Sequence, residues 1–229
     1  MNHYDYCAQF VKSGEDVLDV GAGKGFFCCE MAKRGFNAYG IEINPAYIVK
    51  AKERANDEKV NVSILHGNAE KLPYEDSKFS FVNASEVTEH VEDPIAMCNE
   101  IYRVLKSGAK SYISFHNRYG IYDYHYHLYF INWMPRSWTE FVLKLLKKQK
   151  PDGEAGRQKL ITMYYYTYGE VKRLLEKLGF EVEDIRVGKI KKKFKFFSII
   201  LLPLYYIILR PLYFNTFHIL VTKSLDLKK

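Results

Sequence analysis

The chain has 229 residues, 16% of them aromatic, and a formal net charge of +7. This length can bury one substantial core and is ordinary for a single α/β domain. Residues 1–10 lack the apolar core of a signal peptide, and the four cysteines show no metal-type pairing. We therefore expect a cytoplasmic, reducing compartment, free thiols and no metal site.

The charge is unevenly distributed along the chain. Residues 1–117 carry 13 Lys or Arg against 17 Asp or Glu, residues 118–187 carry 12 against 9, and residues 188–229 carry 9 against 1. A nucleic-acid enzyme more often has a basic cleft mouth, so the acidic N-terminal half argues against a nucleic-acid partner. The asymmetry instead suggests a basic C-terminal part that meets an anionic surface.

Residues 16–27, DVLDVGAGKGFF, are typical of a strand, a glycine turn and a helix. The apolar run over 17–20 predicts a short buried strand that contains Asp19. A helix is predicted over 27–33, and three glycines lie between the two elements: Gly21, Gly23 and Gly25. Such a turn lets a ligand approach bare backbone and places N–H donors at a helix N-terminus.

Strands and helices alternate five times over about 100 residues, which predicts a parallel sheet covered on both faces. The predicted strands of this part are 17–20, 37–43, 60–66, 79–84 and 109–116. The predicted helices are 4–12, 27–33, 46–56 (opened by Pro45), and one from 93–94 to about 107–108. A helix over 169–178, a strand over 180–187 and a last strand over 217–222, antiparallel beside it, complete the chain.

Glu42 stands at the end of the second predicted strand, 17 residues beyond Gly25. Ligands bind at the carboxyl edge of open parallel sheets, and an acid there suits the two hydroxyls of a ribose. The alternative is a surface carboxylate without a ligand. Tyr4 and Tyr6, in the first predicted helix, either cover this pocket or pack at the edge of the domain.

Residues 118–168 interrupt the alternation. They are rich in tyrosine, contain both tryptophans with His125 and His127, and include a predicted basic helix over 141–150. An insertion after the fifth strand stands above the ligand edge, so we expect a substrate lid. Histidines in such a stretch are more often packed or solvated than catalytic.

Residues 188–216 form a second insertion. Its apolar core, 196–209, is 14 residues long and interrupted by Pro203, whereas a membrane-spanning helix needs ~20 apolar residues. Five lysines lead into it: Lys189, Lys191, Lys192, Lys193 and Lys195. This pattern fits a segment over 189–214 at an anionic membrane surface. The alternative is a helical hairpin packed on the lid or on a second subunit.

Five motifs occur in order along the chain: VLDVGAGKGFF (17–27), YGIEIN (39–44), GNAEKLPYEDSKFSFV (67–82), ASEVTEHVEDP (84–94) and IYRVLKSGA (101–109). With them the chain resembles class I S-adenosylmethionine-dependent methyltransferases, and more narrowly the "type 11" subgroup that includes quinone-biosynthesis enzymes. The resemblance covers 14–117 well and 169–187 moderately. It implies one domain over 1–229 with insertions at about 118–168 and 188–216. The implied fold is a Rossmann-like, seven-stranded, mostly parallel sheet with helices on both faces and the last strand antiparallel.

The glycine spacing argues against the nearest α/β rival, an NAD(P)-binding oxidoreductase. Dinucleotide folds use G-x-G-x-x-G, in which a helix end faces a pyrophosphate. Here the pattern is G-x-G-x-G, and Phe26 stands where the dinucleotide pattern has glycine. S-adenosylmethionine has no phosphate to hold.

The resemblance also assigns cofactor contacts. Glu42 would bind the ribose hydroxyls, and Ile43 would lie against adenine. The edge of the adenine would be bounded by Asn68, Ala69 and Glu70, and the methionine part would be bordered by Ser85 and Glu86. The methionine and sulfonium end would be lined by Asp19, Gly21, Ala22, Gly23 and Gly25. Two positions depart from the family pattern, which usually has Asp at Asn68 and near Ser80.

Methyl transfer requires alignment of a nucleophile behind the methyl carbon, and for some acceptors the removal of a proton. His90, in TEHVEDP, is the leading candidate for a base; its alternative role is to cap the next helix. His116 is the second candidate, and Glu89 is expected to orient rather than react. We expect O-methylation of a small or lipid-linked acceptor of saccharide-lipid, quinone or isoprenoid type. The alternatives are a nucleic-acid methyltransferase, an NAD(P)-binding oxidoreductase and a non-catalytic membrane-surface module.

Overall fold

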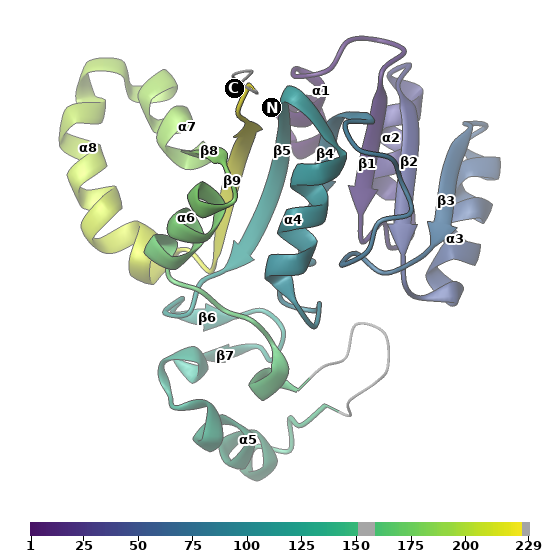
Figure 1. The fold of residues 1–229 in the computed structure, drawn as a ribbon. Helices are drawn as coiled ribbons and strands as arrows, with labels where there is room; N and C mark the ends of the chain where they lie inside the picture. The colour runs from purple at the N-terminus through teal and green to yellow at the C-terminus, as the bar shows by residue number, and fades with distance from the viewer. Residues whose placement is uncertain (151–158, 226–229) are drawn as a thin grey trace.

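The computed structural model describes residues 1–150 and 159–225. Its centre is a seven-stranded sheet in the order β3-β2-β1-β4-β5-β9-β8 (Figure 1). Neighbouring strands are parallel except around β9, which is antiparallel to both β5 and β8. The strands are β1 (Asp16–Val20), β2 (Asn37–Glu42), β3 (Val62–His66), β4 (Phe79–Ala84), β5 (Leu105–His116), β8 (Phe180–Asp184) and β9 (Thr216–Lys223). The predicted fold class is confirmed.

Helices cover both faces of the sheet. The first face carries α1 (His3–Ala8), α2 (Phe26–Lys33) and α3 (Pro45–Asp57), whose apolar residues share one core with Tyr112 of β5 and Ile185. The other face carries α4 (Pro94–Val104) and α6 (Tyr168–Lys177), which pack on a second core. The sheet is therefore buried on both sides, as its near-continuous apolar strands require.

Local sequence sets where these helices begin. Asn44 caps α3 by accepting the Ala46 N–H at 2.9 Å, and Pro45 occupies the first helical turn. Asp93 caps α4 in the same way, and Thr167 with Glu170 forms a capping box at α6. Each cap ends the preceding loop at a fixed residue, so the loops at the carboxyl edge of the sheet have defined lengths.

The lid insertion follows β5. It contains β6 (Tyr122–Asp123), β7 (Leu128–Tyr129), the 3₁₀ turns Ile131–Trp133 and Leu160–Thr162, and α5 (Arg136–Leu145). Tyr126, Leu143 and Leu160 are buried in a small core of its own. Residues 151–158 of the predicted lid lie outside the described residues. The predicted basic helix over 141–150 corresponds to α5, which ends at Leu145. It begins earlier than predicted, at Arg136, directly after Pro135.

The second insertion is helical from Ile185 to Tyr213. It comprises α7 (Ile185–Phe194), a 3₁₀ turn (Lys195–Phe197), α8 (Ser198–Leu204) and a π-helical stretch (Tyr205–Tyr213). By length and composition this stretch passes the test for a membrane-crossing helix, with 11% of its apolar window buried. The helical run is longer than the 14-residue apolar core on which the sequence argument relied, because Pro203 lies inside α8 and does not end it. The length of the run as a whole therefore does not exclude crossing, contrary to the sequence-based expectation.

Three other predicted boundaries differ. The predicted strand over 180–187 ends at Asp184, because that side chain accepts the Arg186 N–H at 3.0 Å and caps α7. The predicted helix over 4–12 ends at Ala8. The helix expected to reach 107–108 ends at Val104, since Leu105 is already extended and pairs with Phe79 ahead of a register shift.

Gly40, in β2, tests how closely the glycine turn packs on the sheet. A Cβ at Gly40 would lie 2.8 Å from the Ala22 Cβ and 3.0 Å from the Cys28 Sγ. Gly40→Ala should lower the free energy of unfolding by ~1–3 kcal/mol, as overpacking does. Gly169→Ala, in α6 with only an Arg173 nitrogen nearby at 3.7 Å, should leave it unchanged or raise it. Urea denaturation of both variants measures the difference, and equal stabilities would contradict this packing.

Candidate functional site

A cavity of about 410 Å³ opens at the carboxyl edge of the sheet, above β1, β2 and β4. Nine residues predicted for the site line it: Gly21, Gly23, Glu42, Ile43, Asn68, Ala69, Glu70, Glu86 and His90. Other lining residues were not predicted, among them Ile41, Asn44, Tyr47, Val87 and Val91. Tyr47 follows the Pro45 helix start by two residues, a spacing that places a side chain back over the strand end.

The glycine turn is open because side chains are excluded from it. Gly21 has φ +71, and a Cβ there would lie 2.4 Å from Val87. Gly23 has φ +53, which glycine adopts without strain. The turn is tied to the sheet by the Ala22 N–H, which donates to the Ile41 carbonyl at 2.8 Å. Bare backbone therefore faces the cavity.

Glu42 is 7% exposed and joins two loops. Its Oε2 accepts the Gly23 N–H and its Oε1 accepts the Asn44 N–H, both at 2.8 Å. The carboxylate thus fixes the glycine turn against the loop after β2 while it lines the cavity. Each carboxylate oxygen can accept a further hydrogen bond, so the group remains able to bind a diol.

Five predicted site residues do not line this cavity. Asp19 lies in the core and accepts the Asn83 amide N–H at 2.6 Å; burial raises the pKa of its carboxyl to about 7. Gly25 caps α2 with φ +76, and a Cβ there would lie 2.9 Å from Ala51. Both residues thus hold the ends of the glycine turn in place, and their contacts with the cofactor stay predictions. The remaining three are Ala22, Ser85 and His116.

Helix α1 approaches the site through His3. Its Nε2 lies 3.0 Å from the Asn83 Oδ1, and its ring packs edge-on against Tyr112. Tyr4 packs near Phe27, and Tyr6 packs against Phe10. The edge-packing alternative for the two tyrosines agrees with the structure, whereas His3 was not singled out from the sequence.

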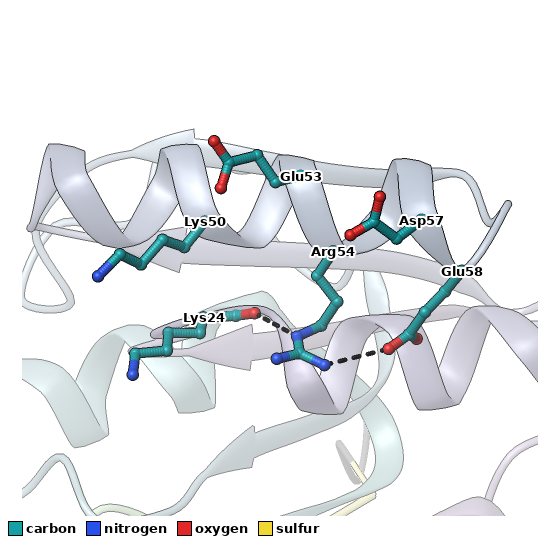
Figure 2. A pocket seen from close by; sticks show the side chains of 6 residues that line it. All are labelled: Lys24, Lys50, Glu53, Arg54, Asp57 and Glu58. Carbon is teal, nitrogen blue, oxygen red and sulfur yellow. Dashed lines mark hydrogen bonds and ion pairs between the residues drawn. The ribbon is translucent and has the colours of Figure 1, made fainter.

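A polar groove on the outer side of α3 is a different feature (Figure 2). Arg54 donates to the Lys24 carbonyl at 3.0 Å and to Glu58 at 3.1 Å, and its guanidinium stacks over Phe26. These contacts pin the outside of the glycine turn to α3. The groove therefore supports the cofactor cavity from behind.

Beside the cavity lies a cluster of two glutamates and three histidines, which we call the histidine–glutamate cluster: Glu86, Glu89, His90, His116 and His125. Glu89 is fully buried at its centre. Its Oε1 lies 3.0 Å from the His116 Nε2, 3.5 Å from the His90 Nε2 and 4.0 Å from the His125 Nε2. His90 belongs both to this cluster and to the wall of the cavity.

His116 and Glu86 form a charged pair in this cluster, with Nε2 and Oε2 2.9 Å apart. Burial alone would lower the pKa of His116, but the interactions with the two carboxylates Glu86 and Glu89 outweigh it and raise the pKa to about 10. Burial would raise the pKa of Glu86, but His116 lowers it to about 2. At neutral pH His116 is therefore protonated and is unsuited to accept a proton. Glu86 has φ 57, and the Ser114 hydroxyl accepts its N–H at 2.7 Å.

The lid contributes His125 to the cluster. Its Nδ1 lies 3.1 Å from the Tyr165 hydroxyl, which donates to Asp123 at 2.7 Å. Burial, with the nearby charge of His116, lowers the pKa of His125 to about 4, so this imidazole is neutral. Sequence analysis did not distinguish His125 from His127, which is exposed and bonds Tyr122.

The cluster also has the geometry of a metal site. In each of two groups, Glu86–Glu89–His116 and Glu89–His90–His125, the potential ligand atoms lie within 4.8 Å of one another. The buried Glu89 Oε1 has no hydrogen-bond partner of good geometry. Carboxylate and imidazole together suit several divalent cations. The sequence-based expectation of no metal considered only the cysteines and missed this group.

A second cavity, of about 620 Å³, lies between the lid and the start of β9. Its wall is largely aromatic, and its polar side chains include Arg186, Asn215, Thr216 and His218. Tyr112 connects it to the first site, because its hydroxyl bonds the His218 Nδ1 and the Ser85 side chain. Burial, aided by the charge of Arg186, lowers the pKa of His218 to about 4.

The sequence of β5 contains a pattern that could have identified Tyr112 and Ser114 as residues near the site. Tyr112, Ser114 and His116 alternate with the buried Ile113 and Phe115, so the three polar residues share one face of the strand. His218, in β9, pairs with Ser114 of β5 and extends the same polar face. The period-2 pattern was available from the sequence, but the pairing register was not.

The comparisons with known proteins agree with this geometry. A family model described as a methyltransferase domain matches residues 18–113, which contain the glycine turn, Glu42 and the Glu86–His90 segment. Residues 18–113 are thus similar to a methyltransferase domain. The bare glycine turn, the Glu42 carboxylate and the volume of the cavity fit S-adenosylmethionine, the cofactor that the sequence resemblance implies.

Ubiquinone biosynthesis O-methyltransferase of Coxiella burnetii is 30% identical over 144 residues, which are 63% of this chain and 58% of that protein. The chain thus spans a little over half the length of the curated relatives it matches. A SAM-dependent methyltransferase from Methanosarcina mazei superposes with a TM-score of 0.62 at 20% identity, over 99% of this chain and 100% of that one. Phosphoethanolamine N-methyltransferase 2 of Haemonchus contortus, in complex with S-adenosyl-L-methionine, gives 0.62 at 19%, over 98% and 53%. At these identities the two structures establish the shared fold.

Glu42→Ala tests the cofactor site. Loss of the charged acceptor should weaken S-adenosylmethionine binding by ~1.5–3 kcal/mol, roughly 10- to 100-fold in Kd. Isothermal titration calorimetry measures this, and a thermal melt confirms that the variant folds. Glu53→Ala, an exposed carboxylate on α3, is the matched control and should bind as the wild type does. Equal affinity of the Glu42 variant and the wild type would contradict the assignment.

Proposed function

We propose that this protein is an S-adenosylmethionine-dependent O-methyltransferase whose acceptor is a small or lipid-linked amphiphile with a hydroxyl group. The observation that carries the proposal is the position of His90, which lines the cofactor cavity and contacts the buried Glu89 at 3.5 Å. An oxygen nucleophile benefits from a proton acceptor at this point. The O-methyltransferase name of the Coxiella burnetii relative supports the choice of oxygen as the acceptor atom.

In this proposal the cofactor supplies an activated methyl group, and the protein aligns the acceptor and handles its proton. His90 is the base, and Glu89 accepts the proton of its second nitrogen or stabilises the imidazolium that forms. The pKa of His116 is too high for it to act as the base. His116 instead positions Glu86 and Glu89, which it contacts. Alignment in the cavity accounts for much of the rate enhancement.

We include a divalent cation in the Glu86–Glu89–His116 group. The oxygens of Glu86 and Glu89 that face His116 lie within 4.8 Å of each other, so a positive charge between the two carboxylates stabilises them. In the metal-free protein the protonated His116 supplies this charge. A metal there would lower the pKa of a coordinated acceptor hydroxyl and would displace the His116 proton.

The acceptor class follows from the second cavity. Its aromatic wall suits an apolar or planar group, and Arg186 suits a carboxylate, phosphate or phenolate. The polar face of β5 connects the two cavities, because Tyr112 bonds His218 of the second cavity and His116 bonds Glu86 of the cofactor cavity. An amphiphile with an oxygen-rich head and an apolar remainder fits these two environments.

The other hypotheses from the sequence find less support. The match of residues 18–113 to a methyltransferase domain disfavours the oxidoreductase. A nucleic-acid acceptor would need a basic approach, whereas the carboxylates Glu42, Glu70, Glu86 and Glu92 line the cofactor cavity. The non-catalytic membrane module leaves the shaped cofactor cavity without a role.

His90→Gln should lower the methylation rate by ~10²–10⁴-fold, the usual contribution of a general base. The assay incubates the protein with labelled S-adenosylmethionine and a membrane-lipid extract and follows the label into lipid. Cofactor affinity, measured by calorimetry, should not change, since His90 lies at the acceptor end. His127→Gln, an exposed lid histidine, is the control. An unchanged rate in the His90 variant would exclude it as the base.

The metal is tested without catalysis. Mg²⁺, Mn²⁺ or Zn²⁺ at 100 times its Kd should stabilise the protein by about 2.7 kcal/mol, seen as a rise in Tm. Binding should also release protons to the buffer, because His116 must lose its proton. Glu89→Gln, and separately Glu86→Gln, should abolish both effects, whereas Glu53→Gln should not. If no cation raises the Tm of the wild type above that of the variants, the cluster binds no metal.

A further inference from the structure

A helical hairpin with an exposed apolar side projects from the sheet between β8 and β9. Helix α7 leads away from Asp184, and α8 with the π-helical stretch returns to β9 (Figure 1). The reversal occurs at Lys195, which has φ 43 and ψ −114. The helical run from 185 to 213 is therefore two short arms joined at a tip.

The apolar side of α8 points away from the protein. Phe196 in the 3₁₀ turn is 78% exposed, Ile200 in α8 is 70% exposed, and Ile207 in the π-helical stretch is 72% exposed. Further exposed residues on the tip and this arm are Phe194, Phe197, Ile199, Leu204 and Ile208. Contiguous apolar exposure of this kind marks an interaction surface.

A buried polar contact holds this orientation. Tyr205, the first residue of the π-helical stretch, is 1% exposed, and its hydroxyl donates to Asp184 at 2.7 Å. Arg210 lies 3.7 Å from the same carboxylate and stacks over Tyr168 at 3.8 Å. Turning the apolar side inward would break this network and leave the Asp184 Oδ2 without Tyr205 and Arg210, which is costly.

The hairpin carries the entire net charge of the protein. Residues 185–216 contain seven Lys or Arg and no Asp or Glu, whereas the remaining 197 residues contain 27 of each kind. Four of the basic residues gather at the exposed tip: Lys191, Lys192, Lys193 and Lys195. Within residues 1–150 and 159–225, none of these four forms an ion pair. A partner that is complementary to the lysine tip and to the exposed apolar side chains beside it offers negative charge next to an apolar region.

We propose that the hairpin docks the protein on the surface of an anionic lipid bilayer. The outer side of α8 enters the boundary between headgroups and acyl chains, and the tip lysines bind the anionic headgroups. Crossing is disfavoured by length, because the ten residues of α7 extend only ~15 Å, about half of the ~30 Å hydrocarbon core. A crossing hairpin would leave the lysine tip inside that core.

Docking would also place the second cavity beside the lipid. Arg186 of α7 and Tyr213, Phe214 and Thr216 at the end of the hairpin line that cavity. The root of the hairpin is thus a wall of the proposed acceptor site. This consequence depends on the proposed function; the docking itself does not.

Vesicle co-sedimentation of the full chain tests the docking. The wild type should bind phosphatidylcholine vesicles that contain phosphatidylglycerol, should bind pure phosphatidylcholine weakly, and should be released by salt. Two variants should bind the anionic vesicles at least tenfold more weakly: Ile200→Glu with Ile207→Glu, and Gln at Lys191, Lys192, Lys193 and Lys195. The matched control places Gln at four exposed lysines elsewhere: Lys12, Lys50, Lys52 and Lys71.

The outcomes separate docking from catalysis. Calorimetry should give the same S-adenosylmethionine affinity for every variant, which also shows that each one folds. Equal vesicle binding by the wild type and the two hairpin variants would overturn the proposal. So would light scattering that shows a dimer, lost in the Ile200→Glu/Ile207→Glu variant, with no vesicle binding. Resistance of the bound wild type to alkaline carbonate would show insertion across the bilayer and overturn surface docking.

Discussion

The Glu42 carboxylate joins the two loops from which the cofactor cavity is built. It accepts one N–H from the glycine turn and one from the loop after β2, and it is nearly buried in doing so. A buried carboxylate is stable only when its oxygens are hydrogen-bonded, so these two backbone donors hold the loops at a fixed separation. Arg54 reinforces the arrangement from the outside by holding the Lys24 carbonyl.

The histidine–glutamate cluster also contains a buried carboxylate that needs partners. Glu89 is fully buried, yet its Oε1 faces three imidazoles without a hydrogen bond of good geometry. Such an atom is stabilised by a positive charge close by, which His116 provides when protonated and a divalent cation provides when bound. The raised pKa of His116 and the lowered pKa of Glu86 have this common cause. His90 connects the cluster to the cofactor cavity.

The two insertions extend the domain in different directions. The lid carries its own small core and brings His125 to the cluster through Tyr165 and Asp123. The hairpin leaves its apolar side in solvent, because Tyr205 and Asp184 bond on its inner side. Both insertions meet at the second cavity, whose wall takes tyrosines from the lid and Arg186 from α7. An acceptor held there would contact both.

The sequence by itself determined the sheet, the glycine turn and the place of Glu42, because alternating elements, glycine spacing and strand ends are local properties of the chain. It also located His90, since TEHVEDP follows the fourth strand directly. Only the tertiary structure decided which distant groups meet. His3 lies 80 residues from Asn83, His218 lies 106 residues from Tyr112, and His125 lies 36 residues from Glu89. Strand register and loop closure set these contacts. The hairpin, too, needed the structure, because the reversal at Lys195 and the bond between Tyr205 and Asp184 determine which side of its helix faces outward.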